Sequence, residues 1–154
     1  MDAYPRSEGL YCETTNCVAS NCVIIANAAG GDGGGAFGGT LQSCKMLMNW
    51  TPFYGGGAAG IDANRGTLCT LKSCVLSGNS ASYGGGVSGA TALNCNIIAN
   101  TAFTAGGAYQ TVLSNCIVYY NNATFYANYP GPAPDHCCIV PLPAAGVGNI
   151  DSDP

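Results

Sequence analysis

Charged side chains are scarce in this chain. Of its 154 residues only 8% are Asp, Glu, Lys or Arg, and the four basic residues leave a formal net charge of −4. Such a small number of basic residues argues against a phosphate-binding surface, and we expect no nucleic-acid partner. No apolar run approaches the roughly 18 residues that a membrane-spanning helix needs, so we expect no membrane span.

The chain also has few strong helix formers, and no apolar stripe persists at a 3.6-residue period. Glycine supplies 23 residues and recurs throughout, which disfavours helix. Apolar residues make up 47% of the chain, which argues against disorder of the low-hydrophobicity kind. The length allows at most one ordinary domain. We therefore expect a single all-β unit.

What the chain does contain is a repeat. Five cysteines are each followed five residues later by an asparagine, and the steps between these cysteines are 22, 30, 21 and 21 residues. The pairs are Cys22 and Asn27, Cys44 and Asn49, Cys74 and Asn79, Cys95 and Asn100, and Cys116 and Asn121. A shared signature at a nearly constant period indicates a solenoid in which each repeat forms one coil.

The pattern within a repeat is that of strands. The second residue after each cysteine is apolar, which places both side chains on one face of a strand. About 21 residues per coil suit three short strands joined by three bends. We predict a right-handed, single-stranded parallel β-helix, triangular in section, with about five to six coils of 21–22 residues. Residues 1–16 would form an irregular segment or partial coil, residues 17–128 the repeats, and residues 129–154 a Pro/Gly-rich closing segment.

Both repeated side chains have a structural interpretation. An inward asparagine amide offers two donors and an acceptor, so stacked asparagines can bond one another and the backbone of a bend. Stacked cysteines would lie about 4.8 Å apart, the spacing of neighbouring strands, with parallel Cβ directions that suit a disulfide poorly. We therefore expect an asparagine ladder beside a ladder of small, buried, free thiols.

Five cysteines lie outside this pattern. One of Cys137 or Cys138 would continue the ladder, being 21 or 22 residues beyond the last repeat cysteine. A disulfide between Cys12 and Cys17 would tie down the N-terminal end, and the pairing among these four and Cys69 stays open. A zinc site needs four ligands at chelating spacing, and nothing near the single histidine completes such a set. We expect no metal and no other cofactor.

The second coil is eight or nine residues longer than its neighbours, with the excess within residues 58–67. In solenoids such insertions form loops on one face, often the binding face. This loop holds Asp62 and Arg65, which together with the nearby Tyr54 or Tyr83 form a candidate ligand-binding site for a glycan. The alternative interpretation is an inert surface loop.

The acidic residues do not suggest an enzyme. A glycosidase needs two carboxyl groups roughly 5–10 Å apart. Asp32 and Asp62 are 30 residues apart, which matches the long step and would place them on adjacent coils near the glycine corner. No third ligand falls in register with them. We therefore expect no catalytic residues.

An apolar stripe would run down the outer side of the cysteine-containing strand. It comprises residues one and three after the repeat cysteines, namely Val23, Val75, Ile117, Ile25, Leu47, Ile98 and Tyr119. A contiguous exposed apolar surface more often marks a contact than bare solvent exposure. This face and the open coil ends are therefore candidates for self-association.

Three features together resemble a known group of proteins. These are the Asn-Ser/Thr-Ala turns, the Gly-Gly-Gly-apolar corners and the Cys-x-apolar-x-x-Asn motif, and they resemble bacterial right-handed parallel β-helix repeat proteins with the pectin-lyase-like fold. Residues 77–87 are similar to repeats of polymorphic outer-membrane proteins and autotransporter passengers. Residues 137–154 resemble the segment that closes the repeat region in large secreted β-helix proteins of environmental bacteria.

The resemblance implies a module of a larger exported bacterial protein, although the first residues do not form a signal peptide. Two functional hypotheses follow. The first is a non-catalytic extracellular or cell-surface β-helix, stalk-like or adhesin-like. The second is a polysaccharide-binding or polysaccharide-degrading fragment, a lyase or hydrolase, since this fold supports many activities. A polysaccharide or a cell-surface molecule would be the partner.

Overall fold

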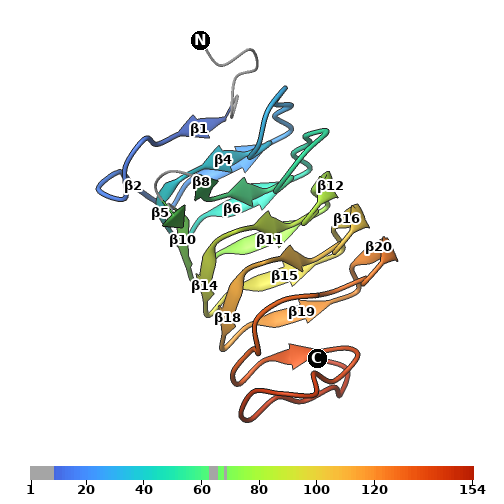
Figure 1. Ribbon diagram of the computed structural model, residues 1–154. Helices are drawn as coiled ribbons and strands as arrows, with labels where there is room; N and C mark the ends of the chain where they lie inside the picture. Colours follow the sequence, from blue (N-terminus) through green and yellow to red (C-terminus); the bar gives the residue numbers. More distant parts are fainter. Residues whose placement is uncertain (1–8, 63–65, 68) are drawn as a thin grey trace.

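The chain folds into a parallel β-solenoid. The computed structural model describes residues 9–62, 66, 67 and 69–154, and in this part of the chain all regular structure is β-strand (Figure 1). Parallel sheets of up to six strands stack the coils in about five turns. The predicted all-β solenoid is therefore confirmed.

Three sheets run through most of the stack, and each takes one strand from successive coils. Sheet A contains β1 (Leu10–Tyr11), β4 (Ala36–Phe37), β7 (Ala58–Ala59), β13 (Val87–Ser88) and β17 (Ala108–Tyr109). Sheet B contains β18 (Val112–Ser114), β14 (Thr91–Leu93), β10 (Cys69–Lys72), β5 (Gly39–Gln42) and β2 (Val18–Ser20). Sheet C contains β21 (Cys138–Ile139), β19 (Ile117–Tyr119), β15 (Asn96–Ile98), β11 (Val75–Ser77), β6 (Lys45–Leu47) and β3 (Val23–Ile25).

The predicted triangular cross-section is incomplete, because part of the stack has a fourth strand in each coil. A fourth parallel sheet, sheet D, contains β12 (Ser80–Tyr83), β16 (Thr101–Thr104) and β20 (Asn122–Phe125). These strands begin directly after the ladder asparagines, where the sequence pattern offered only a small-residue turn. Their inward residues are alanines, Ala81 pairing with Ala102 and Ala102 with Ala123, which fit close to the narrow core. The sequence pattern did not predict the strands of sheet D because their inward side chains are alanines, which produce only a weak apolar alternation.

Backbone positions of left-handed conformation recur from coil to coil, and two of them flank the strand of sheet C. The residue before each ladder cysteine and the residue before each ladder asparagine have positive φ, for example Asn94 at 54° and Ala99 at 55°. This region is uncommon for residues other than glycine, and it recurs here because neighbouring coils hold each bend in register. The bends place the cysteine and the asparagine side chains inside the coil.

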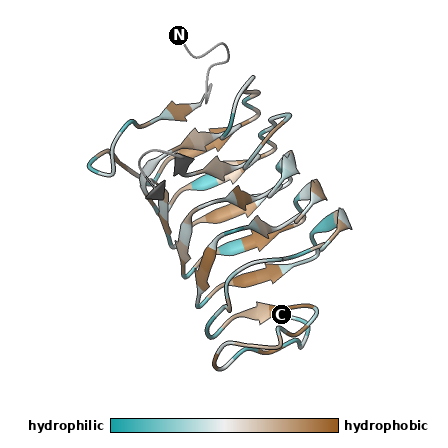
Figure 2. Ribbon diagram, viewed as in Figure 1, coloured by the Kyte–Doolittle hydropathy of each residue, from teal (hydrophilic) through white to brown (hydrophobic). Residues whose placement is uncertain are grey.

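The core is a narrow column of stacked like residues. Leu41, Leu71, Ala92 and Leu113 form one row in sheet B, and all four are buried. The second residues after the cysteines form another buried row in sheet C, as predicted: Ile24, Met46, Leu76, Ile97 and Val118. Figure 2 shows that the strands of sheet C are mostly hydrophobic.

The asparagine ladder is present, and its inner amides are fully bonded. The Nδ2 of each of Asn27, Asn49, Asn79 and Asn100 donates to the Oδ1 of the next ladder asparagine at 2.9–3.0 Å. Asn128, which sequence reasoning missed, receives the bond from Asn121 at 2.9 Å. Asn128 lies only seven residues after Asn121, so the 21-residue period could not reveal it. No buried side-chain nitrogen or oxygen of the described residues lacks a hydrogen-bond partner.

The cysteine ladder is buried except at its first member. Cys44, Cys74, Cys95 and Cys116 are buried, and Cys137 continues the row, which decides between it and Cys138. Cys22 is exposed, so the prediction of burial was wrong there. Burial in a solenoid comes from the coils on both sides, and Cys22 directly precedes β3, the end strand of sheet C.

The two ends differ in structure. At the N-terminal end Cys12 and Cys17 form a disulfide with Cα atoms 5.8 Å apart, and the eight other cysteines are free thiols. At the C-terminal end β21 adds a rung beneath β19, and Ile150 forms a parallel bridge to Cys138. The closing segment thus supplies hydrogen-bond partners for part of the backbone at β21, the last strand.

Candidate functional site

Three tyrosines form an aromatic row on the outside of the solenoid. The ring centroids of Tyr54 and Tyr83 are 4.9 Å apart with an interplanar angle of 20°. Tyr109 lies beside them, 5.3 Å from Tyr83 at 50° and 6.2 Å from Tyr54 at 35°. Tyr54 is 41% exposed and the other two are half-buried. We call these three residues the tyrosine row.

The coil geometry explains why these tyrosines meet. Tyr54 and Tyr83 form an isolated parallel bridge, so they occupy one position on adjacent coils. Tyr109 belongs to β17 and pairs with Ser88, on the other side of the glycine corner. The corner is tight: a Cβ built on Gly85 would lie 2.3 Å from the carbonyl oxygen of Thr101. Only glycine permits this close approach of coils, which brings rings of two different sheets together.

The row has one acidic neighbour. Asp32 Oδ1 accepts a 3.2 Å hydrogen bond from the backbone N–H of Tyr54. Burial is the main cause that raises the pKa of the Tyr54 phenol, followed by Tyr83, Tyr109 and Asp32. The phenol is therefore neutral near pH 7, and it can both donate and accept hydrogen bonds.

The sequence-predicted site is only partly assembled. Tyr54 and Tyr83 do meet, whereas Arg65 lies outside the described residues. Asp62 ends β8 (Ile61–Asp62), which forms an antiparallel hairpin with β9 (Gly66–Thr67). The insertion is thus a hairpin arm as far as it is described. The sequence analysis did not find Tyr109. This residue follows the glycine corner of its coil, whereas Tyr83 precedes the glycine corner of its coil, so no fixed sequence spacing relates the two.

The suggested carboxylate pair of Asp32 and Asp62 is not supported. The insertion lies after Ala59, so the coil offset at Asp32 is 22 residues, and the facing residue is Tyr54. Asp62 lies within the insertion, where it pairs with Gly66 in the hairpin of β8 and β9. The 30-residue step relates Gly39–Gln42 to Cys69–Lys72, beyond that hairpin. Among the described residues no three His, Cys, Asp or Glu side chains converge to hold a metal ion.

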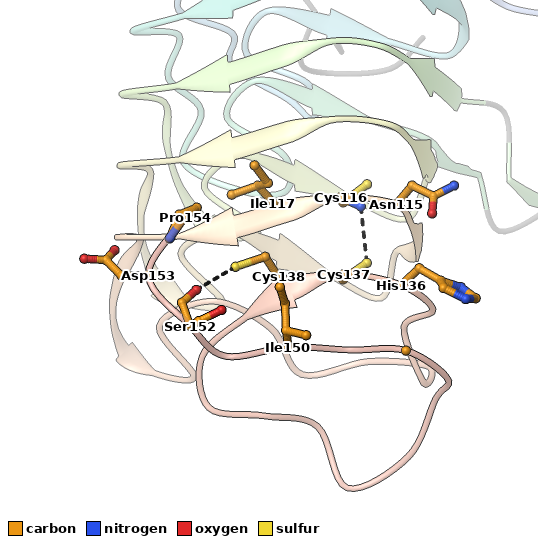
Figure 3. A pocket seen from close by; sticks show the side chains of 11 residues that line it. Asn115, Cys116, Ile117, His136, Cys137, Cys138, Ile150, Ser152, Asp153 and Pro154 are labelled. Carbon is orange, nitrogen blue, oxygen red and sulfur yellow. Dashed lines mark hydrogen bonds between the residues drawn. The ribbon is translucent and has the colours of Figure 1, made fainter.

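A concavity lies at the C-terminal end of sheet C. It has a volume of about 460 Å³ and lies between β19, β21 and the last residues of the closing segment. Figure 3 shows that the His136 side chain points away from the Cys138 sulfur. The Cys138 thiol instead donates a 3.0 Å hydrogen bond to the carbonyl oxygen of Ser152.

The Cys138 thiol is not activated. Burial raises the pKa of Cys138, and the carboxylates of Asp153 and Asp151 raise it further. A catalytic cysteine needs the opposite shift, because the thiolate is the nucleophile. Cys138 and His136 therefore do not form the pair of thiol and imidazole that acyl transfer requires.

The outward stripe of sheet C is present as predicted from the sequence. Val23 and Ile25 are exposed, and the other five members are half-buried: Leu47, Val75, Ile98, Ile117 and Tyr119. Lys45, Ser77 and Asn96 interrupt the apolar surface. At its C-terminal end the stripe is contacted by the chain itself, since the Tyr119 hydroxyl donates to the carbonyl oxygen of Asp151 at 3.3 Å.

Comparison with known proteins adds no relative: no protein-family model, curated protein or solved structure matches the chain. No helix in the described part of the chain is long and apolar enough to cross a membrane. The class of the molecule is therefore defined by its own structure, as a parallel β-solenoid with asparagine and cysteine ladders.

Proposed function

We propose that this chain is a non-catalytic β-solenoid module of a larger exported protein, serving as a stalk or adhesin-like element at a cell surface. The proposal rests on the observation that the polar side chains inside the described solenoid are already hydrogen-bonded within the fold. The inner ladder amides bond one another and the backbone, and no buried side-chain polar atom in the described chain is left unpaired. Catalytic sites instead concentrate strained or perturbed polar groups in a cleft.

Three of the described carboxylates have structural partners. Asp32 accepts from the Tyr54 backbone, and Asp135 Oδ1 accepts from the backbone N–H of Val147 at 3.1 Å. Asp153 accepts from the Tyr120 hydroxyl. These bonds hold a corner and the closing segment in place, which is a structural role and not that of the two catalytic carboxyl groups of a glycosidase.

An exported location is supported by the Cys12–Cys17 disulfide, because such bonds persist in oxidising compartments. The resemblance of the repeats to bacterial parallel β-helix proteins with the pectin-lyase-like fold, and to autotransporter passengers, points the same way. A regular solenoid suits a stalk because each coil is stabilised by its neighbours, so length can grow without a new core.

The test is a search for turnover. Purified protein is incubated with pectin, polygalacturonate and alginate, with and without Ca²⁺, and new reducing ends and unsaturated products are measured. We expect none above a heat-denatured control. Sustained product formation that scales with protein concentration would overturn the non-catalytic assignment.

Glycan binding by the tyrosine row is the second candidate. Sugars present both apolar faces and hydroxyl groups, and tyrosine offers a ring and a hydroxyl to match. The row presents three such groups within 6.2 Å of one another, beside a carboxylate. The rings already stack on one another, so a sugar would use the outer ring faces and the hydroxyl groups.

A pull-down with insoluble polysaccharides tests this candidate. The variant is Tyr83→Ala, which removes the middle ring of the row. The matched control is Phe103→Ala, an exposed aromatic in β16 of the same sheet D that packs edge-on against Phe125. Loss of binding in the first variant alone supports the row, and equal binding by both variants and the unaltered protein contradicts it.

A further inference from the structure

Six thiols form a single column through the solenoid. They lie at one corner of successive coils, between sheets B and C, and comprise Cys22, Cys44, Cys74, Cys95, Cys116 and Cys137. Most of these residues fill the corner as small hydrophobes, and their sulfur atoms also accept and donate hydrogen bonds. A continuous row of free sulfur atoms has a chemistry that an apolar row lacks.

The contacts show that the sulfur atoms lie above one another. The backbone N–H of Cys74 donates to the Sγ of Cys95 at 3.4 Å, and that of Cys95 donates to the Sγ of Cys116 at 3.4 Å. The same contact joins Cys116 to Cys137, as the dashed line in Figure 3 shows. Each thiol from Cys74 to Cys137 also donates to a backbone carbonyl oxygen, at 3.2–3.4 Å.

The spacing between sulfur atoms in this column does not suit disulfide formation, but it suits the binding of a metal ion between two thiolates. A disulfide needs sulfur atoms about 2.05 Å apart and converging Cβ directions. Coils stack about 4.8 Å apart, the spacing of neighbouring strands. A metal–thiolate bond is about 2.3 Å long, as for zinc, so a cation midway between two sulfurs spans about 4.6 Å. The gap between coils therefore matches a cation held by two thiolates in line.

We propose that the thiol column binds soft monovalent cations, copper(I) or silver(I), one in each gap between stacked thiolates. Thiolate is the ligand class that selects such cations. Each inner sulfur bridges two cations, each S–H bond is replaced by bonds from sulfur to metal, and the protons leave to solvent. One positive charge per gap nearly balances one negative charge per thiolate, so little net charge is buried.

This arrangement needs no cluster of three ligands. None is found among the described residues, and each cation in the column uses only two sulfurs. The column also has an open end: Cys22 is exposed, whereas Cys44 above it is 1% exposed. Cations would enter at Cys22 and be passed from gap to gap. Cys69 and Cys138 lie outside the column and serve as internal controls.

Silver(I) is the probe, because it needs no reductant. The protein, with its disulfide intact, is titrated with Ag⁺ and the bound ions are counted by native mass spectrometry. The decisive variant is Cys95→Ser in the middle of the column. Bridging predicts that this variant loses about two ions, because one thiolate borders two gaps. Independent binding at each thiol predicts the loss of about one.

The control variants are Cys69→Ser, which removes a buried thiol off the column, and Cys22→Ser at its end. We expect no loss of column ions in the first and a loss of about one ion in the second. X-ray absorption on the silver-loaded protein should show two sulfur neighbours per ion. A loss of one ion in Cys95→Ser, or silver uptake only with loss of the β-sheet circular dichroism spectrum, overturns the proposal. If Cys95→Ser fails to fold, Cys74→Ser gives the same count.

Discussion

Asn79 and Asn100 are joined by two hydrogen bonds to one oxygen. The Nδ2 of Asn79 and its backbone N–H both donate to the Oδ1 of Asn100, each at 2.9 Å. The second Nδ2 hydrogen of Asn79 is donated to the carbonyl oxygen of Met46 at 2.9 Å. Its own Oδ1 accepts from the backbone and the side chain of Asn49. One side chain therefore satisfies polar groups on both neighbouring coils.

Asn79→Ala should destabilise the protein by about 2–4 kcal/mol. The substitution leaves the carbonyl of Met46 and the amide groups of Asn49 without their partner inside the core, and each unsatisfied buried group costs about 1–3 kcal/mol. Chemical denaturation followed by circular dichroism measures the change.

The matched control is Asn96→Ala, in the adjacent coil. Asn96 lies in β15 with its side chain exposed, so its loss should change stability by no more than about 0.5 kcal/mol. Equal midpoints for the two variants would show that the amide stack contributes nothing beyond an ordinary surface residue.

Two glycines at different bends of one coil, Gly85 and Gly78, should tolerate substitution by alanine very differently. A Cβ on Gly85 would lie 2.3 Å from the carbonyl oxygen of Thr101 and 2.6 Å from that of Gly106. Both are backbone atoms fixed by the coil above, so Gly85→Ala should cost about 3 kcal/mol. Thermal unfolding of the two alanine variants, Gly85→Ala and Gly78→Ala, tests this.

Gly78 is the informative comparison. It has φ of 68°, but its Cβ would meet nothing closer than 3.4 Å. Ala26 and Ala99 occupy the same bend position in other coils, with φ of 56° and 55°. Gly78→Ala should therefore cost only the left-handed strain of about 1 kcal/mol. A larger loss at Gly78 than at Gly85 would mean that backbone conformation, rather than coil contact, fixes these glycines.

The sequence predicted the features that repeat and missed those that do not. The cysteine-to-asparagine spacing defined the coils, the inward rows and the amide ladder, because identical residues at a fixed period must stack. Asn128 ends the ladder out of register, and Tyr109 reaches Tyr83 around a corner. Neither relationship has a constant spacing, so only the folded backbone reveals it.

Two errors of the sequence interpretation, at Asp32 and at Cys22, have one cause. Asp32 was paired with Asp62 because the long step was applied to the whole coil, although the insertion begins only after Ala59. Cys22 was expected to be buried because it belongs to the repeat, although burial depends on the coils above and below. A period identifies equivalent positions, but it does not locate an insertion within a coil or the end of a stack.

Thiol alkylation should separate the first ladder cysteine from the rest. Cys22 is exposed, whereas Cys44, Cys74 and Cys95 are at most 1% exposed. Iodoacetamide at pH 8 should label Cys22 within minutes and leave the other three unlabelled until the protein unfolds, because labelling then requires opening of the coil. Peptide mass spectrometry reads out each site. Rapid labelling of Cys95 in the native protein would contradict the stacked core.

Alkaline pH should destabilise the protein through Cys69. Burial raises the pKa of this thiol from its ordinary value of 9.0 to about 12, with a smaller contribution from Cys74. Below pH 9 the thiol is protonated in both the folded and the unfolded states. Between pH 9 and 12 the unfolded chain releases a proton that the folded chain retains, so the free energy of unfolding falls as pH rises.

The size of this effect is bounded by about 1.4 kcal/mol per pH unit for one group. Other thiols and tyrosines also ionise in this range, so the comparison is with Cys69→Ala, which retains all of them. Urea denaturation of both proteins from pH 8 to 11 gives the difference in unfolding free energy. That difference should be constant up to about pH 9 and should then shift in favour of Cys69→Ala, because the variant has no thiol to ionise in the unfolded state. A difference that stays flat to pH 11 would mean that the Cys69 thiol ionises as easily in the folded protein as in the unfolded chain.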